Sequence, residues 1–172
     1  MRFWLALALF LPLVAAAQSP GFGEDSADRD RRREDPVLLP QFPETENYLP
    51  FEVSATTPFA FFVDAKSISV GAGGVVRYSL IAKSADGGFN VSFEGMRCSD
   101  GQFRTYAFGR ADKTWSGLRN SRWEAIRVDP RNAPRAMLYR DFFCTLGREI
   151  TSADAGIRAL KTGGNSRTII SD

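Results

Sequence analysis

The chain has 172 residues, of which 22 are Lys or Arg and 20 are Asp or Glu, giving a formal net charge of +2. This near balance does not favour a nucleic-acid-binding protein. The chain has no histidine and two cysteines, which excludes a Ser-His-Asp triad, a Cys-His dyad and a His-ligated or thiolate zinc site.

Residues 1–17 have the pattern of a secretory signal peptide. Met1-Arg2 is a short positive start, Phe3–Val14 is an apolar run broken only by Pro12, and Ala15–Ala17 supplies the small residues of a cleavage site. The run is shorter than the roughly 20 apolar residues that span a bilayer. We expect cleavage after Ala17 and a periplasmic location, and about 155 residues then remain, enough for one domain.

Two segments without helix or strand periodicity come next. Gln18–Asp35 is rich in both charges, so we expect a flexible charged arm that buries too little surface to become ordered. The single domain should then span residues 36–172. It starts with the proline-rich stretch Pro36–Pro50, because proline disfavours both helix interiors and central strands. We expect this stretch to be extended and to pack four side chains along the domain: Leu38, Leu39, Phe42 and Tyr48.

Between Phe59 and Gly109 apolar and polar residues alternate, with breaks at Gly- and Asp-rich positions. This pattern predicts a meander of half-buried antiparallel strands. The expected strands are Phe51–Ser54, Phe59–Val63, Ser67–Val70, Val75–Lys83, Phe89–Cys98, Gln102–Gly109 and, after an irregular stretch, Trp123–Val128.

After Asp129-Pro130 the apolar spacing becomes helical. Pro134–Cys144 predicts a first helix, with Pro134 suited to the first turn. Thr151–Leu160 predicts a second helix, which a hydroxyl side chain caps and Gly163-Gly164 ends. The fold class is therefore α+β, a mostly antiparallel β-meander followed by two C-terminal helices.

The register of the central hairpin decides which residues share a face. A pairing in which residue numbers sum to 171 joins the apolar sides, with Tyr78 opposite Phe93. The other face then carries an ion pair framed by hydroxyls, formed by Arg77, Ser79, Ser92 and Glu94. Two interpretations of this face stay open. It is either a solvated sheet face or a shallow binding surface that the aromatic residues Tyr106, Trp115 and Trp123 border.

The next turn allows two registers. Asp100-Gly101 suits a two-residue type I′ loop, which would place Phe108 opposite Phe93. A three-residue loop would instead place Ala107 opposite Phe93. The first of these is our prediction.

Cys98 and Cys144 are the only cysteines. In an exported chain an isolated pair predicts a disulfide. Closing a loop of about 47 residues would stabilise the fold by about 4 kcal/mol.

We expect no catalytic residue, cofactor or metal site. Gly71-Ala-Gly-Gly lacks the lysine and the helix of a phosphate-binding loop. The acids in structured segments are Glu94, Asp64 and Asp141. Asp64 is expected to fix a turn, and Asp141 is expected to pair with Arg140.

Six segments together resemble one family: LPQFP (39–43), FFVDAKSISVG (61–71), VVRYSL (75–80), FEGMRC (93–98), YAFGR (106–110) and LYRDFFC (138–144). The chain resembles the CNP1-like ("cryptic neisserial protein") family of uncharacterised proteobacterial envelope proteins. The resemblance implies a Gram-negative exported protein and brings no known activity or ligand. The order of strands is also similar to surface-adhesin E proteins, from which this chain departs at its C-terminal helices.

These observations favour a periplasmic, non-catalytic binding or structural module of the cell envelope. Its expected partner is an envelope protein or polymer, and neither nucleic acid nor a transmembrane segment of the mature chain is expected. One alternative is a surface-exposed adhesin-like protein. Another is a carboxylate-dependent hydrolase of envelope polysaccharide or peptide.

Overall fold

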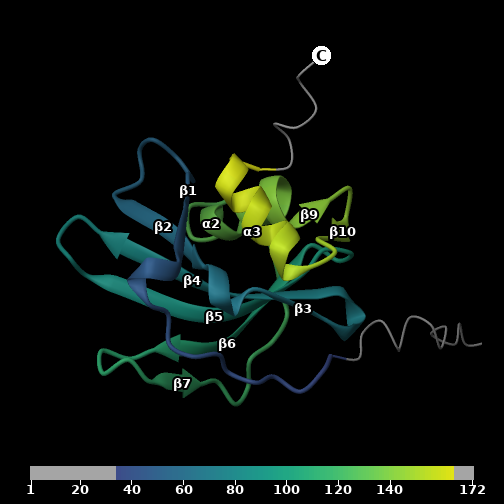
Figure 1. Ribbon diagram of the computed structural model, residues 1–172, viewed down its shortest axis with the longest axis horizontal. Helices are drawn as coiled ribbons and strands as arrows, with labels where there is room; N and C mark the ends of the chain where they lie inside the picture. Colours follow the sequence, from purple (N-terminus) through teal and green to yellow (C-terminus); the bar gives the residue numbers. More distant parts are fainter. Residues whose placement is uncertain (1–33, 165–172) are drawn as a thin grey trace, which may run out of the picture.

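The computed structural model describes residues 34–164 (Figure 1). The predicted signal peptide and arm residues 18–33 lie outside these residues. Within the described part, eight strands form one sheet with the order β1-β2-β4-β5-β6-β7, while β3 pairs with β4 and β8 with β6. Every pairing is antiparallel. Together with two C-terminal helices, this confirms the α+β class.

The strands of the sheet are β1 (Tyr48–Phe51), β2 (Phe59–Asp64), β3 (Ser69–Gly71), β4 (Val75–Ser84), β5 (Phe89–Arg97), β6 (Gln102–Gly109), β7 (Trp115–Gly117) and β8 (Glu124–Ala125). The four longest match the predicted strands to within a residue or two. The first strand lies three residues earlier than predicted, β7 was not predicted, and the predicted strand 123–128 shrinks to two residues. Pro50 lies within the terminal strand β1, opposite Phe62.

The helical layer covers one face of the sheet (Figure 1). It begins with α2 (Ala133–Met137), which runs directly into a π-helical segment, η4 (Leu138–Phe143). The predicted helix 134–144 is therefore α-helical up to Met137 and π-helical from Leu138 to Phe143. A short hairpin of β9 (Cys144–Thr145) and β10 (Arg148–Glu149) leads to α3 (Ala153–Thr162). Ser152 caps α3 by accepting a hydrogen bond from the Ala155 amide at 3.2 Å, and Gly163 ends it with φ 84°.

Two apolar cores result, one on each face of the sheet. Between sheet and helices, Tyr78 of β4 contacts Phe143, with ring centroids 5.1 Å apart. On the opposite face, a smaller cluster of Phe93, Tyr106 and Ala107 packs against Val37 and Trp115. The segment that brings Val37 there, residues 34–43, is here called the strap.

The strap holds fewer apolar contacts than expected. Phe42 packs against Trp115, with ring centroids 5.2 Å apart, and the Trp115 indole N–H donates to the Pro40 carbonyl at 2.9 Å. Leu38 and Leu39 are exposed instead of packed, so the prediction for these two residues is wrong.

The predicted register of the central hairpin is wrong by one residue. Residue numbers sum to 172, so Tyr78 faces Glu94 and Ser79 faces Phe93. The loop runs from residue 85 to 88, and Gly87 has φ 85°. Because the strap covers the second face, both sides of the hairpin are buried, and the polar pattern does not mark a solvent side.

The next turn also differs from both predicted forms. Arg97 pairs with Gln102, so the turn has four residues, and Gly101 but not Asp100 has a positive φ. A type I′ loop needs positive φ at both positions. A register shift after Phe93 then places Ala107 opposite it, which contradicts the predicted pairing with Phe108.

Candidate functional site

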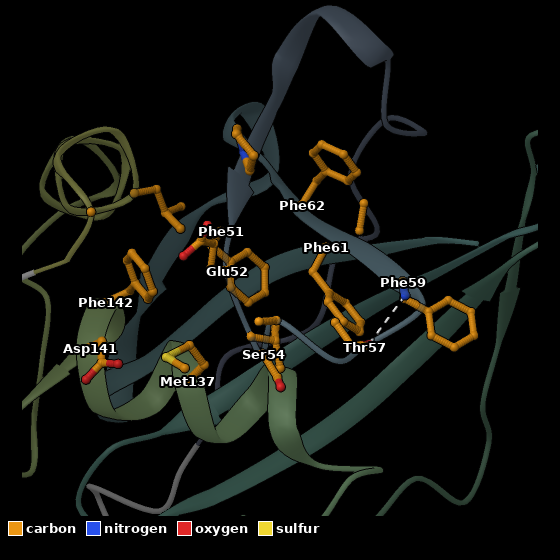
Figure 2. Close-up of a pocket in the computed structure, with 16 residues that line it drawn as sticks. Phe51, Glu52, Ser54, Thr57, Phe59, Phe61, Phe62, Met137, Asp141 and Phe142 are labelled. Atoms are coloured by element: carbon orange, nitrogen blue, oxygen red, sulfur yellow. Dashed lines mark hydrogen bonds between the residues drawn. The ribbon is translucent and has the colours of Figure 1, made fainter. Parts of the chain in front are cut away.

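A groove of about 880 Å³ opens between the β1–β2 loop and the helical layer (Figure 2). One wall is formed by loop residues 52–58 and by β2. The other wall comes from Met137, Asp141 and Phe142 of the α2–η4 helix and from the C-terminal end of α3. Its lining is mostly apolar, with hydroxyl and carboxylate groups among the residues around it.

Four phenylalanines form an aromatic row along the groove: Phe142, Phe51, Phe61 and Phe59. Their successive ring centroids are 5.9, 6.1 and 6.2 Å apart, within the range of favourable aromatic pairs. Phe142 and Phe51 are buried, whereas Phe59 is 40% exposed. The row therefore extends from the apolar core to the protein surface. An exposed apolar surface beside a groove is typical of a binding site.

The helical wall is fixed at one end by a buried ion pair. Glu94 of β5 accepts hydrogen bonds from Arg135 Nε at 2.8 Å and from its Nη2 at 2.6 Å. Such a paired, two-bond contact holds a guanidinium in one orientation. Arg135 belongs to α2 and lies two residues before Met137, so the pair positions the start of this wall.

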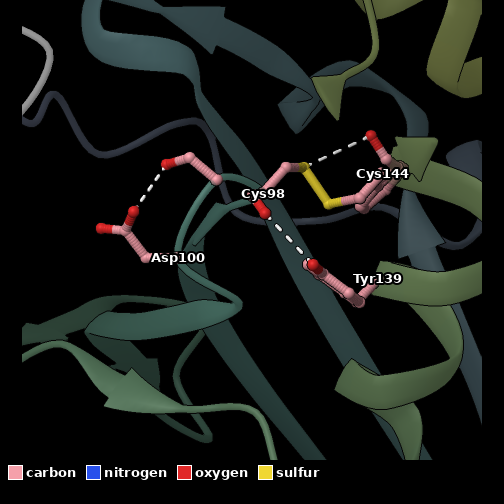
Figure 3. Close-up of a disulfide and its surroundings, with 6 residues drawn as sticks. Cys98, Asp100, Tyr139 and Cys144 are labelled. Atoms are coloured by element: carbon pink, nitrogen blue, oxygen red, sulfur yellow. Dashed lines mark hydrogen bonds between the residues drawn. A yellow bond between two sulfur atoms is a disulfide. The ribbon is translucent and has the colours of Figure 1, made fainter. Parts of the chain in front are cut away.

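The other end of the wall is fixed by the predicted disulfide, which is confirmed. Cys98 follows β5, and Cys144 follows η4 directly, with 5.4 Å between their Cα atoms. Figure 3 shows the bond and the Tyr139 hydroxyl, which donates to the Cys98 carbonyl at 3.1 Å. The disulfide therefore ties the end of the central hairpin to the helical layer.

Loop 52–58 of the opposite wall has only local support, in contrast to β2, which pairs with β1 and β4 in the sheet. The hydrogen bonds of loop 52–58 join residues at most three positions apart, such as Ser54 with Thr56 and Thr57. Such a loop belongs to the low-stability part of a structure. The groove therefore has one rigid wall, and in its other wall the adjustable loop 52–58 adjoins the paired strand β2.

The charged residues that line the groove are both acidic. Glu52 is exposed and has no ion pair within residues 34–164, whereas Asp141 accepts two hydrogen bonds from Arg140 at 2.9 Å each. The predicted Asp141–Arg140 pair is thus present. A ligand with apolar side chains and a nearby cation would complement this lining.

The predicted site residues do not form one surface. Arg77 and Ser79 face the strap, whereas Ser92 and Glu94 face the helices, and all four are buried. The predicted Arg77–Glu94 pair is replaced by pairs with Glu34 and Arg135. Neither interpretation of an exposed polar face therefore applies, and none of the four residues lines the groove.

Sequence reasoning missed the groove because most of its lining residues were assigned separately to strands or helices, with no sign that they meet. The one available signal was FAFF at 59–62, where alternation alone would place a polar residue beside Phe61. The phenylalanines at 51 and 142 meet only through tertiary folding.

Burial and charge shift the pKa values around Glu94. Burial and then the neighbouring carboxylate of Glu94 raise the pKa of Tyr78 well above its ordinary value. Burial lowers the pKa of Arg135, but its contact with Glu94 outweighs this and raises the pKa overall. Both shifts keep Tyr78 neutral and Arg135 charged, which preserves the anchor of α2.

Residues 34–164 contain no cluster of three His, Cys, Asp or Glu side chains arranged to hold a metal ion. Asp64 fixes a turn as predicted, because its carboxylate accepts from the Lys66 amide at 3.3 Å. None of the helices in this range has the length and hydrophobicity that crossing a bilayer requires.

Comparison with known proteins gives one result. The family model described as CNP1-like family matches residues 27–161, which includes nearly all of the described fold. Neither a curated protein nor a solved structure matches the chain.

Proposed function

The chain belongs to the CNP1-like family, and from its groove we propose that it is a non-catalytic binding module of the cell envelope. Its ligand is an apolar peptide segment of another envelope protein that also carries a Lys or Arg. The observation that carries this proposal is the aromatic row, which leaves the core and ends at the exposed ring of Phe59.

The composition of the groove favours a peptide over a lipid. Arg140 compensates the charge of Asp141, but the Glu52 carboxylate has no ion pair within residues 34–164 and would repel the phosphate of an anionic lipid. A basic residue of a peptide would instead be attracted. Met137 supplies an adaptable apolar surface in the rigid wall, and the adjustable loop 52–58 suits ligands of differing side-chain shape.

The expected location agrees with this role. The N-terminal pattern of residues 1–17 is typical of export, and the Cys98–Cys144 disulfide persists best in an oxidising compartment such as the periplasm. We therefore propose a periplasmic location. Surface proteolysis of intact cells tests it, because an adhesin-like surface protein would be cleaved and a periplasmic protein would be spared.

The binding test uses a random peptide library selected on the purified mature protein. Selected peptides should combine aromatic or aliphatic residues with Lys or Arg. Phe59→Ser should weaken their binding at least tenfold. Phe89→Ser is the matched control, because this ring is 46% exposed and lies outside the groove.

Charge reversal gives a second arm of the test. Glu52→Lys should weaken binding, whereas Asp86→Lys, an exposed acid in the β4–β5 loop, should not. Equal effects of the Phe59 and Phe89 changes would contradict the proposal. So would tighter binding to anionic lipid vesicles than to any selected peptide.

A further inference from the structure

The face of the sheet beneath the strap contains an arginine site formed by Arg77, Arg104 and Tyr106. Arg77 of β4 and Arg104 of β6 lie on either side of Gly95 in the register of the sheet. The Tyr106 phenol lies directly over Gly95, where a Cβ atom would overlap it. Both guanidinium carbons lie within 6 Å of the Tyr106 ring centroid, at 5.8 Å for Arg77 and 5.5 Å for Arg104.

This site already holds a carboxylate, that of Glu34 in the strap. Arg77 Nη2 donates to Glu34 Oε1 at 3.2 Å, and the Tyr106 hydroxyl donates to the same oxygen. Arg104 Nη1 donates to the other oxygen, Oε2, at 3.4 Å. The two oxygens of the Glu34 carboxylate therefore accept hydrogen bonds from different donors, Oε1 from Arg77 and Tyr106 and Oε2 from Arg104.

The strap residues that follow Glu34 make further contacts with the rest of the fold. The Asp35 carboxylate accepts from the Ala72 amide at 2.8 Å, and the Asp35 carbonyl accepts from Arg77 at 2.6 Å. Val37 packs against the apolar cluster beside the site. The strap is therefore bound as an extended peptide would be, with an acidic pair followed by an aliphatic residue.

The arginine site contains a hydrogen-bond donor that Glu34 does not use. The Arg77 side chain is buried and its Nε–H has no hydrogen-bond partner among the described residues. An unpartnered buried donor costs stability, and a binding role is one reason for a protein to retain such a donor. The small Gly95 beneath the phenol keeps Tyr106 low against the sheet, which leaves the arginines free to converge above it.

We propose that Arg77, Arg104 and Tyr106 form a carboxylate-binding site that takes an extended acidic segment of a partner protein in place of Glu34. The recognised pattern is that of the strap, an acidic pair followed by an aliphatic side chain. Because Glu34 is tethered, its effective concentration at the site is about millimolar. The strap therefore keeps the site closed to simple anions, and only a ligand that makes several contacts displaces it.

The test removes the Glu34 carboxylate from the arginine site and adds the strap sequence as a separate peptide. Mature protein carrying Glu34→Ala is titrated with a fluorescent peptide of the strap sequence, EDPVLLPQFP, and binding is followed by anisotropy. The variant should bind this peptide at least tenfold more tightly than wild-type protein does. A peptide in which both acids are alanine should lose this gain, and so should the variant that also carries Arg104→Gln.

Two controls keep the result interpretable. Glu46→Ala removes an exposed acid whose only ion pair in the described part of the chain is a 3.9 Å contact with Lys66, and it should bind the peptide as wild-type protein does. Glu34→Gln, which keeps the side-chain shape, replaces Glu34→Ala if the latter does not fold. Formate should compete with the peptide on the vacated site more strongly than inorganic phosphate at equal concentration.

Three outcomes would overturn the proposal. They are binding of the strap peptide by the vacated protein no better than by wild type, equal binding of the alanine peptide, and displacement of the peptide by phosphate as readily as by formate. The first two would make Glu34 a structural contact only, and the third would remove the preference for a carboxylate. None of them affects the proposed groove, which Phe59→Ser tests separately.

Discussion

Removing Arg135 should destabilise the protein far more than neutralising its partner Glu94. Glu94 is fully buried, whereas the side chain of Arg135 is 17% exposed. Among residues 34–164, Arg135→Met leaves the buried carboxylate with only the hydroxyls of Ser92 and Tyr78 as partners, at 2.6 and 3.3 Å. Removing one partner of a buried pair costs about 3–5 kcal/mol, because the other charge is left uncompensated.

Glu94→Gln should cost less, about 1–3 kcal/mol. The remaining guanidinium borders an open cavity of about 560 Å³, so water can solvate it. The glutamine oxygen can still accept one bond from it. In the double variant no uncompensated buried charge remains, and its cost should therefore be smaller than that of Arg135→Met alone.

The assay is urea unfolding of the oxidised mature proteins, followed by tryptophan fluorescence and analysed by linear extrapolation. The double-mutant cycle gives the coupling between the two residues. Equal costs for the two single variants, or a double variant whose cost is their sum, would refute the reasoning. Such a result would mean that Arg135 does not neutralise Glu94 in solution.

Three further predictions concern stability. Replacing either cysteine of the disulfide with serine should lower the free energy of unfolding by about 2–5 kcal/mol, and an unchanged urea midpoint would contradict this. Gly95→Ala should cost about 1–3 kcal/mol by overpacking against the Tyr106 phenol. Gly117→Ala is the thermal-melting control, because a Cβ atom added there would meet no heavy atom of the described residues within 4 Å apart from its chain neighbours. Burial raises the pKa of Asp64 above its ordinary 3.8, so the wild type loses stability as pH rises from 3.8 through that raised value. Asp64→Asn should therefore gain stability relative to wild type between pH 3 and pH 7, and a constant difference in unfolding free energy would argue against the shift.

The strands were predictable because alternation with period two survives even where both faces are covered. Their register was not. The central hairpin carries polar residues on both faces, and each finds a partner from a distant segment: Glu94 from α2 and Arg77 from the strap. A sequence shows that such residues are polar but not that they are buried with a partner. The pairing rule therefore selected the wrong register.

The groove was less predictable than the fold. Its aromatic row joins Phe51 to Phe142, a contact between segments that the sequence assigns to different elements. The π-helical winding of η4 has no signal in residue spacing, yet it sets which side chains of that segment face the sheet. The disulfide was predictable because only one pairing of two cysteines is possible.

The proline in β1 limits the ability of other chains to add a strand to this edge of the sheet. Pro50 lies in the terminal strand of the sheet and has no N–H to offer to a further strand. Exposed sheet edges are templates on which other chains add strands and aggregate, and proline is one of the devices that prevent this. At this edge, recognition therefore depends on side chains entering the groove, and sheet extension from one molecule to the next is disfavoured in a crowded compartment.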